Sequence, residues 1–184
     1  DFSNPLDIVR EAISNSFDAK ATEIHILFTV FMEYGRRKLK ITIRDNGHGM
    51  DANELKSFFD LGNSTRRVQK TTDENIIGEK GHGTKIYFNS ECVTVTTGKS
   101  GRKYVAVMQN PLGLLYEGKV PTVEVEETLE DFEGTLIEII GYNGNERAIF
   151  NHDRVKDHIY WFTKFGSFEK EIYPERSYDV KLYL

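Results

Sequence analysis

Three short polar and glycine-rich segments in the first half of the chain restrict the folds that this sequence can adopt. They are EAISNSFD at residues 11–18, DNGHGM at residues 45–50 and GEKGHGTK at residues 78–85. The first has the spacing of an amphipathic helix, the second follows a strand-like run, and the third reads as a glycine-rich loop. A fold that uses all three must bring a helix, the end of a strand and a loop to one pocket.

Size and composition predict one globular domain. The chain has 184 residues, of which 39% are hydrophobic and 29% charged, and its net charge of −5 gives no basic footprint for nucleic-acid binding. Cys92 is the single cysteine, which excludes an intrachain disulfide and favours a reducing, cytoplasmic location. No apolar run reaches the ~20 residues of a membrane helix, so no membrane partner is expected. Because the chain begins with Asp1 rather than Met, we expect a trimmed or internal domain.

An amphipathic helix is predicted over residues 6–19. Its apolar residues recur at spacings of three and four and form a stripe that faces the core: Leu6, Val9, Ile13 and Phe17. Glu11, Asn15 and Asp18 fall at i, i+4 and i+7 and therefore share another side of the helix. An amide oxygen at Asn15 suits Mg²⁺, and a carboxylate at Glu11 could take a proton from an attacking water. The alternative is that all three form the solvated face of an ordinary helix.

The remaining pattern predicts a sheet accompanied by a few helices. Helices are expected at residues 51–61, after Gly83 and at residues 153–165, and strands at residues 22–31, 38–44, 92–97, 103–109, 122–127 and 135–140. The polar stretch at residues 62–79 predicts a lid or mobile loop. We expect residues 1–150 to form the domain, with the lid at about 62–80. Residues 151–184 then form a C-terminal helix and tail, packed on this domain or leading to a second one.

The DNGHGM segment predicts a turn that could receive a purine. Asp45 ends an alternating strand, and Gly47 and Gly49 permit positive φ and a close approach of ligand to the backbone. A carboxylate there can accept a hydrogen bond from an exocyclic amine, and Met50 offers a soft apolar surface to the ring. The alternative is a tight Asn-Gly hairpin turn.

The GEKGHGTK segment predicts a phosphate-binding loop. Gly78, Gly81 and Gly83 expose backbone N–H groups, a helix starting near Thr84 would add its positive end, and Lys85 would add a charge. A plain surface turn is the alternative. Residues 98–100, Gly-Lys-Ser, look like the end of a P-loop, but the required glycine is Val93 here, so a hairpin turn is predicted.

In combination, the order E-x₃-N-x₂-D, DNGxGM, GxxGxG resembles the GHKL (Bergerat-fold) ATPases, which include gyrase B subunits, ninety-kilodalton heat-shock chaperones, histidine kinases, MutL and MORC proteins. The stretch at residues 4–24 is especially similar to the MutL and heat-shock chaperone helix and its following strand. Gly134-Thr135 resembles the family's late strand, whose threonine reaches adenine through water. The resemblance implies an α/β two-layer sandwich: a mixed, mostly antiparallel sheet with helices on one face, and ATP between the helices and a lid.

The resemblance also implies a role for each matching position. Glu11 would be the general base and Asn15 the magnesium ligand, with Asp18 as a supporting polar residue. Asp45 would bind the adenine amino group. The other implied nucleotide-binding residues line the base pocket or meet the phosphates: Gly47, Gly49, Met50, Thr135, and then Gly81, His82, Gly83, Thr84 and Lys85. No separate role is assigned to the imidazole of His82.

The glutamate favours hydrolysis, because histidine kinases generally lack it at this position. The resemblance therefore implies ATP and Mg²⁺ as cofactors, and ATP hydrolysis that drives a conformational and dimerisation switch of a larger protein. ATP or ADP, a second copy of the chain, and a protein client or DNA reached through other domains are the expected partners. Two alternatives stay open: a histidine- or serine-kinase-type phosphotransferase, and a non-catalytic nucleotide-sensing module. The family hydrolases often take a lysine from a second domain, which begins near Ser177 at the earliest, so turnover by this chain itself is left open.

The C-terminal region is rich in aromatic residues. They are expected to form core or a docking surface for a neighbouring domain: Tyr160, Trp161, Phe162, Phe165 and Phe168.

Overall fold

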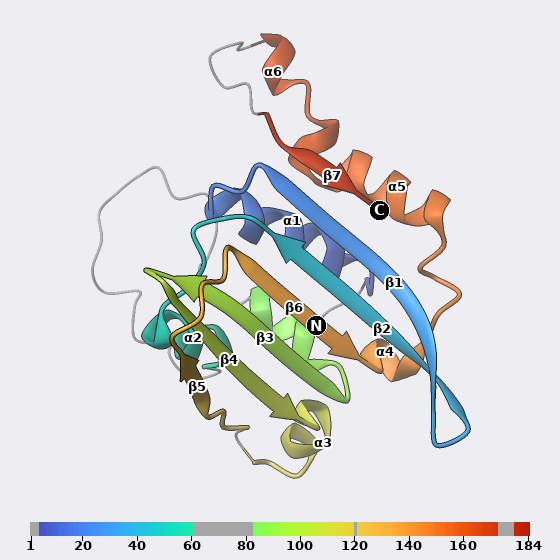
Figure 1. Ribbon diagram of the computed structural model, residues 1–184. Helices are drawn as coiled ribbons and strands as arrows, with labels where there is room; N and C mark the ends of the chain where they lie inside the picture. The colour runs from blue at the N-terminus through green and yellow to red at the C-terminus, as the bar shows by residue number, and fades with distance from the viewer. Residues whose placement is uncertain (1–3, 61–82, 120, 173–178) are drawn as a thin grey trace.

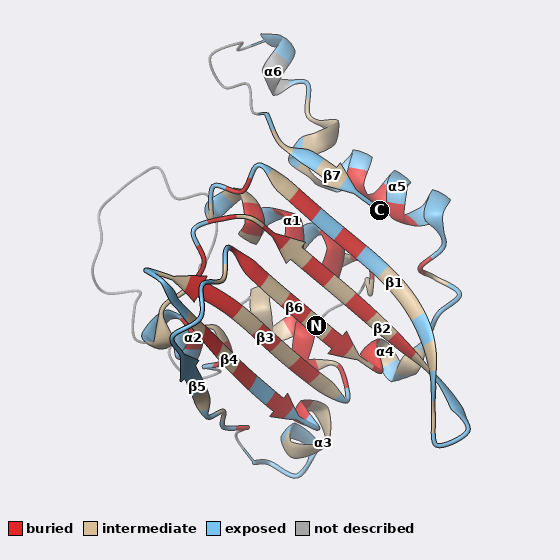
Figure 2. Cartoon of the chain, viewed as in Figure 1, coloured by how far each residue is buried: buried red, intermediate tan, exposed pale blue. Residues whose placement is uncertain are grey.

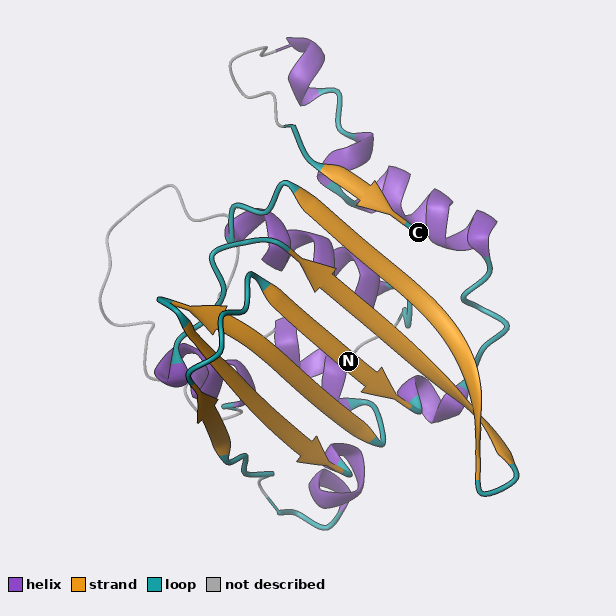
Figure 3. Ribbon diagram, viewed as in Figure 1, coloured by secondary structure: helices purple, strands orange, loops and turns teal. Residues whose placement is uncertain are grey.

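The computed structural model describes residues 4–60, 83–119, 121–172 and 179–184, and these form a sheet covered by helices on one face (Figures 1 and 3). The seven-stranded sheet has the order β5-β4-β3-β6-β2-β1-β7. Its strands are β1 Glu23–Glu33, β2 Arg36–Asp45, β3 Cys92–Lys99, β4 Arg102–Gln109, β5 Val125–Thr128, β6 Thr135–Ile140 and β7 Lys181–Tyr183. Only β1 and β7 pair in parallel among these neighbours. The predicted α/β two-layer sandwich with a mixed, mostly antiparallel sheet is confirmed.

The helices are short. They are α1 Asp7–Asp18, α2 Ala52–Phe59, α3 Pro111–Tyr116, α4 Tyr142–Asn145, α5 His152–Phe162 and α6 Glu169–Ile172, with 3₁₀ turns η2 Gly83–Phe88 and η3 Lys164–Gly166. Of these, α1, α2 and η2 lie behind the sheet as drawn in Figure 1, and α5 lies beside α1. Among the described helices, none combines the length and the apolar character that a membrane crossing requires.

The core lies between the sheet and α1, α2 and η2. Along β2, Leu39, Ile41 and Ile43 are buried and the residues between them are only half-buried, so one face of the strand points inward (Figure 2). On α1, Val9 and Ile13 meet this face and are almost fully buried. Each such side chain contributes about 1.5–3 kcal/mol of hydrophobic free energy. Packing of the predicted stripe therefore holds α1 against the sheet.

Two tight hairpins frame the sheet. Tyr34-Gly35 joins β1 to β2 and Ser100-Gly101 joins β3 to β4, with positive φ at all four residues. Two central residues with positive φ are what a two-residue hairpin with the usual strand twist requires. The Gly-Lys-Ser sequence at residues 98–100 therefore belongs to a hairpin, as predicted.

Several elements differ from the sequence expectations. The strand expected at residues 122–127 is only Val125–Thr128, and the helix after Gly83 is a six-residue 3₁₀ turn. Four short elements were not predicted: α3, α4, α6 and β7. They lack a periodic pattern, and β7 has three residues whose strand conformation comes from pairing with β1.

The aromatic residues of the C-terminal region are mostly exposed. Tyr160, Trp161, Phe162 and Phe168 each expose half or more of their surface, so the core interpretation is wrong for these four. The inward side of α5 instead carries three other residues: Val155, His158 and Ile159. Only Phe165 is half-buried, next to Phe17 of α1 at a ring-centroid distance of 5.5 Å. The docking-surface interpretation stays a prediction.

Candidate functional site

Helix α1 places Glu11 and Asn15 side by side. The Asn15 amide nitrogen donates to the Glu11 carboxylate, Nδ2 to Oε1, at 3.0 Å, and both side chains are half-buried. Burial raises the pKa of Glu11; the Asn15 hydrogen bond and the charge of Arg10 oppose this shift, and the charge of Asp18 adds to it. Asp18 ends the helix and is exposed. The solvated-face interpretation thus fits Asp18 and fits the other two poorly.

The described end of the glycine-rich loop reaches Glu11. A Cβ added at Gly83 would overlap the Glu11 carboxylate, so the two residues are in close contact. Thr84 and Lys85 follow on η2 and are half-buried. Because η2 is a six-residue 3₁₀ turn rather than an α-helix, the positive end expected near Thr84 is weaker than that of a longer α-helix. Gly78, Gly81, His82 and the predicted lid at 62–80 lie outside the described residues.

Tyr87 of η2 was not predicted to belong to the site. Its side chain is fully buried, its ring stacks on Phe58 with centroids 5.7 Å apart, and its hydroxyl has no hydrogen-bond partner among the described residues. Burial raises the pKa of Tyr87 well above its usual range; the negative charge of Glu11 adds to the shift and the Asn15 amide opposes it. Helix α1, which carries the Glu11–Asn15 pair, packs against η2, which carries Tyr87.

Three polar residues line up across the sheet beside α1, and we call them the Asp45 row. Asp45 of β2 pairs with Thr135 of β6, which pairs with Thr97 of β3. Asp45 is buried, accepts from the Gly47 backbone N–H at 2.9 Å, and accepts from the Ser16 hydroxyl at 3.4 Å. Burial raises the pKa of Asp45, and these hydrogen bonds oppose the shift. Sequence and structure agree that Asp45 and Thr135 belong together.

Thr97 joins the Asp45 row to the DNGHGM segment, and it was missed from the sequence. Its hydroxyl oxygen accepts from the Met50 backbone N–H at 2.8 Å and lies 3.1 Å from both the Gly134 carbonyl oxygen and the Thr135 hydroxyl. Thr97 is fully buried. No local signal distinguishes it from Thr94 or Thr96, because only the strand register selects it.

The glycines of this region permit the backbones to approach one another. Gly49 and Gly134 have positive φ, and a Cβ at either would overlap a backbone carbonyl oxygen, of Gly98 and Asp45 respectively. At Gly47, whose φ is not positive, a Cβ would come within 2.7 Å of the Ala19 carbonyl oxygen. Of the two glycines that permit positive φ, Gly49 therefore adopts it and Gly47 does not.

The DNGHGM segment does not form the alternative hairpin. Asn46 instead ties the end of β2 to the start of β1, since its Oδ1 accepts from the backbone N–H groups of Thr22 and Glu23 at 2.9 Å each. The chain then enters α2, where Asp51 and Glu54 form the predicted capping box.

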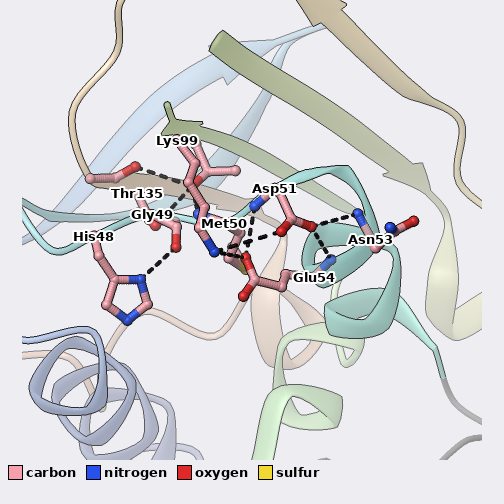
Figure 4. A network of polar contacts seen from close by, with 10 residues as sticks. His48, Gly49, Met50, Asp51, Asn53, Glu54, Lys99 and Thr135 are labelled. Atoms are coloured by element: carbon pink, nitrogen blue, oxygen red, sulfur yellow. Dashed lines mark hydrogen bonds and ion pairs between the residues drawn. The ribbon is translucent and has the colours of Figure 1, made fainter. Parts of the chain in front are cut away.

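Around this helix start, the Lys99 ammonium lies 2.6 Å from Glu54 and 3.6 Å from Asp51 (Figure 4). His48 turns its ring to the Gly49 carbonyl, with its Nδ1 at 2.8 Å.

The residues of the candidate site do not line the hollow of about 820 Å³ that lies between the β1–β2 hairpin and residues 145–148. Among the described residues, no group of three or more His, Cys, Asp or Glu side chains is placed to hold a metal ion. Any Mg²⁺ near Asn15 would accordingly need oxygen ligands from elsewhere, as phosphates and water provide.

Comparison with known proteins supplies the family. Residues 4–111 match the family described as histidine kinase-, DNA gyrase B- and HSP90-like ATPase. The chain belongs to this family. ATP binding and hydrolysis are the chemistry of this family.

Several relatives of this ATPase domain are DNA mismatch repair proteins MutL. The chain is 28% identical to MutL of Colwellia psychrerythraea over 159 residues, which cover 80% of the chain and 23% of the relative. It is 36% identical to MutL of Aquifex pyrophilus over 69 residues, which cover 38% of the chain and 15% of the relative. The chain thus spans about a quarter or less of these relatives. A crystal structure of the N-terminal domain of a DNA repair protein matches 84% of the chain and 40% of its own length, with 20% identity and a TM-score of 0.47.

Proposed function

We propose that this chain binds ATP between α1 and the Asp45 row, and hydrolyses it with Mg²⁺. The observation that carries the proposal is the Ser16 contact with Asp45, because Ser16 is the neighbour of Asn15 on α1. It makes the Glu11–Asn15 pair and the Asp45 row two sides of one polar cluster. In a member of an ATPase family, such a cluster supports one nucleotide site.

The Asp45 row is the proposed adenine end. A carboxylate has about four lone-pair positions, and Asp45 uses two of them for Gly47 and Ser16. It can therefore also accept from the exocyclic amine of adenine. The Thr135 hydroxyl lies beside it and would reach the base through an ordered water. Met50, half-buried next to the core, would contact the ring along with Gly47 and Gly49.

The Glu11–Asn15 pair is the proposed phosphate end. The Asn15 Oδ1 has no hydrogen bond to the described residues and would be the protein's oxygen ligand to Mg²⁺, with Asp18 nearby and Gly83, Thr84 and Lys85 at the phosphates. When bound, Mg²⁺ would offset the charge of the phosphates. Glu11 would take a proton from the water whose oxygen attacks the γ-phosphorus, while ADP leaves. The raised pKa of Glu11 makes it a better base, since a carboxylate with a higher pKa takes a proton from water more readily.

The wider role that we propose is an ATP-driven conformational and dimerisation switch within a larger cytoplasmic protein. The support is the family and the MutL relatives, whose name assigns them to DNA mismatch repair. The proposed domain comprises residues 1–150, with the lid at 62–80, and residues 151–184 follow as its C-terminal helix and tail. A protein client or DNA would then be engaged outside this domain.

Nucleotide binding is tested by calorimetry of the chain with ATP and with ADP in the presence of Mg²⁺. The proposal predicts saturable binding of both nucleotides. If neither ATP nor ADP gave a heat of binding, the proposal would be overturned.

Hydrolysis is tested in the full-length protein by phosphate release from wild type and from Glu11→Gln. We expect the substitution to lower turnover by roughly 10²–10⁴-fold, the usual contribution of a general base, with ATP affinity retained. Unchanged turnover would remove Glu11 from the mechanism. Transfer of γ-labelled phosphate to protein, rather than its release, would instead indicate the phosphotransferase, and binding with no turnover would indicate the sensing module.

A further inference from the structure

The fully buried Tyr87 hydroxyl stands out because it has no hydrogen-bond partner among the described residues. A buried hydroxyl without a partner costs folding free energy, and phenylalanine would fill the same space without that cost. The ring itself is fully buried and stacks on Phe58 of α2. Packing therefore explains the ring and leaves the hydroxyl unexplained.

Tyr142, the other fully buried tyrosine near α1, shows the ordinary solution. Its hydroxyl donates to the Pro5 carbonyl oxygen at 3.2 Å. The two tyrosines thus form a natural pair: one hydroxyl has a structural partner and the other has none among the described residues.

Helix α1 packs against η2, the turn that carries Tyr87. Gly83, at the start of this turn, touches the Glu11 carboxylate, to which the Asn15 amide is hydrogen-bonded. The pKa of Tyr87 responds to the same two residues. The Asn15 amide nitrogen carries two protons, and one of them goes to Glu11 Oε1 at 3.0 Å. The second proton has no acceptor among the described residues, just as the Tyr87 oxygen has no donor.

We propose that Tyr87 Oη accepts this second proton when Mg²⁺ and ATP are bound, and thereby keeps Asn15 Oδ1 turned to the metal. This inference rests on the proposed function. An amide can turn over and present nitrogen instead of oxygen, and nitrogen bearing two protons cannot bind a cation. Tyr87 is accordingly a positioning residue: it fixes the orientation of the Asn15 amide while Glu11 is engaged with the attacking water.

The test compares Tyr87→Phe with wild type in the full-length protein. We expect the variant to fold with unchanged or increased thermal stability, and to bind ATP without Mg²⁺ as wild type does. The Mg²⁺ concentration required for half-maximal turnover should rise about 5–10-fold, and kcat should fall. A merely structural hydroxyl would leave the Mg²⁺ dependence unchanged.

Tyr142→Phe is the matched control, since it removes a buried hydroxyl that already has a partner. We expect it to lower thermal stability and to leave the Mg²⁺ requirement at the wild-type value. An Mg²⁺ curve for Tyr87→Phe that superimposes on wild type overturns the role of Tyr87 and leaves the proposed function intact. A wild type that binds no nucleotide overturns both.

A measurement on wild type covers the case in which Tyr87→Phe does not fold. The Asn15 side-chain amide protons are assigned by NMR with Asn15→Ala as reference. On addition of Mg²⁺ and a non-hydrolysable ATP analogue, both protons should exchange slowly with water. One proton that keeps exchanging fast would show that no second acceptor is engaged, and would overturn the proposal.

Discussion

The two ends of the proposed nucleotide site are built in different ways. At the adenine end, Asp45, Thr97 and Thr135 lie in one row of paired strands, and every one of them has hydrogen-bond partners within the protein. At the phosphate end, a single hydrogen bond joins Glu11 to Asn15, and the Tyr87 hydroxyl has no partner among the described residues. The adenine end is therefore held by hydrogen bonds within the protein, whereas the phosphate end has two polar groups, the Tyr87 hydroxyl and the Asn15 Oδ1, without a partner among the described residues.

The largest effect that this comparison predicts is the loss of folding stability caused by Gly134→Ala. At Gly134 a Cβ would overlap the backbone carbonyl oxygen of Asp45, and φ is +75°, so neither partner can move aside without breaking the Asp45 row. Overpacking and left-handed strain together predict a loss of about 3 kcal/mol or more in the free energy of unfolding. Urea denaturation measures it.

Gly101→Ala is the control for backbone strain alone, because Gly101 has φ +73° and nothing within 4 Å of an added Cβ. We expect a loss of about 1 kcal/mol for this variant. Equal losses for the two glycines would show that the adenine end is not rigidly built.

The second prediction separates stability from affinity at the adenine end. Burial raises the pKa of Asp45, so Asp45 stabilises the fold when protonated, and this contribution is lost as pH rises through the folded-state pKa. At neutral pH, Asp45→Asn should therefore leave the free energy of unfolding unchanged or higher. ATP affinity should fall about 10–100-fold, as expected when a hydrogen bond to a charged group is lost.

Calorimetry and urea denaturation of the same variant measure both quantities. Asp131→Asn, an exposed loop residue, is the control for removal of one negative charge. An Asp45→Asn protein that binds ATP like wild type would exclude Asp45 from adenine recognition.

The third prediction concerns Gly83 at the phosphate end, where an added Cβ would meet a side chain instead of the backbone. A Cβ at Gly83 would overlap the Glu11 carboxylate, which can rotate away. Gly83→Ala should therefore cost less than about 1 kcal/mol of folding stability, yet lower turnover about 10-fold because Glu11 is displaced. If stability drops as far as in Gly134→Ala, the two ends do not differ in rigidity.

The same contrast explains how much the sequence could predict. Helix α1 and the β1–β2 pair were predicted because their periodicity is local, and the Asp51–Glu54 capping box was predicted from residues three apart. Asp45 and Gly49 were likewise found within one short motif. These features need no knowledge of distant contacts.

The residues that were missed depend on distant contacts. Thr97 joins the site only because β3 pairs with β6 in one register. Tyr87 lies on η2, a 3₁₀ turn whose packing against α1 joins segments far apart in the sequence. On α5, the aromatic residues looked like core, but the helix turns Val155 and Ile159 inward and leaves Trp161 exposed. Composition alone could not tell which side of this helix packs.

The smallest predicted effect lies behind the phosphate end, at the contact between α5 and α1. His158 is buried, with its Nε2 3.5 Å from the Asp7 carboxylate at the start of α1. Burial lowers the pKa of His158; Asp7 opposes this shift and the charge of Arg10 adds to it. Because the folded-state pKa lies below the unfolded value, the unfolded chain binds the proton first. Stability is therefore lost as pH falls below about 6.5, by at most about 1.4 kcal/mol per pH unit for one proton.

The change in stability that His158 causes in acid has the opposite sign to the change that Asp45 causes, because protonation of Asp45 stabilises the folded state. Urea denaturation between pH 5 and 8 should show a shallower acid loss of stability in His158→Phe than in wild type. As the pH falls further toward about 4, the ordinary pKa of an aspartate, Asp45→Asn should show a steeper loss than wild type. The first substitution removes a group that must stay neutral to be buried, and the second removes a group whose burial becomes easier in acid. Parallel curves for wild type and His158→Phe would show that His158 does not couple α1 to pH. Divergence of the two variants in opposite directions would establish that the helix side and the sheet side of the site respond separately to the same proton concentration.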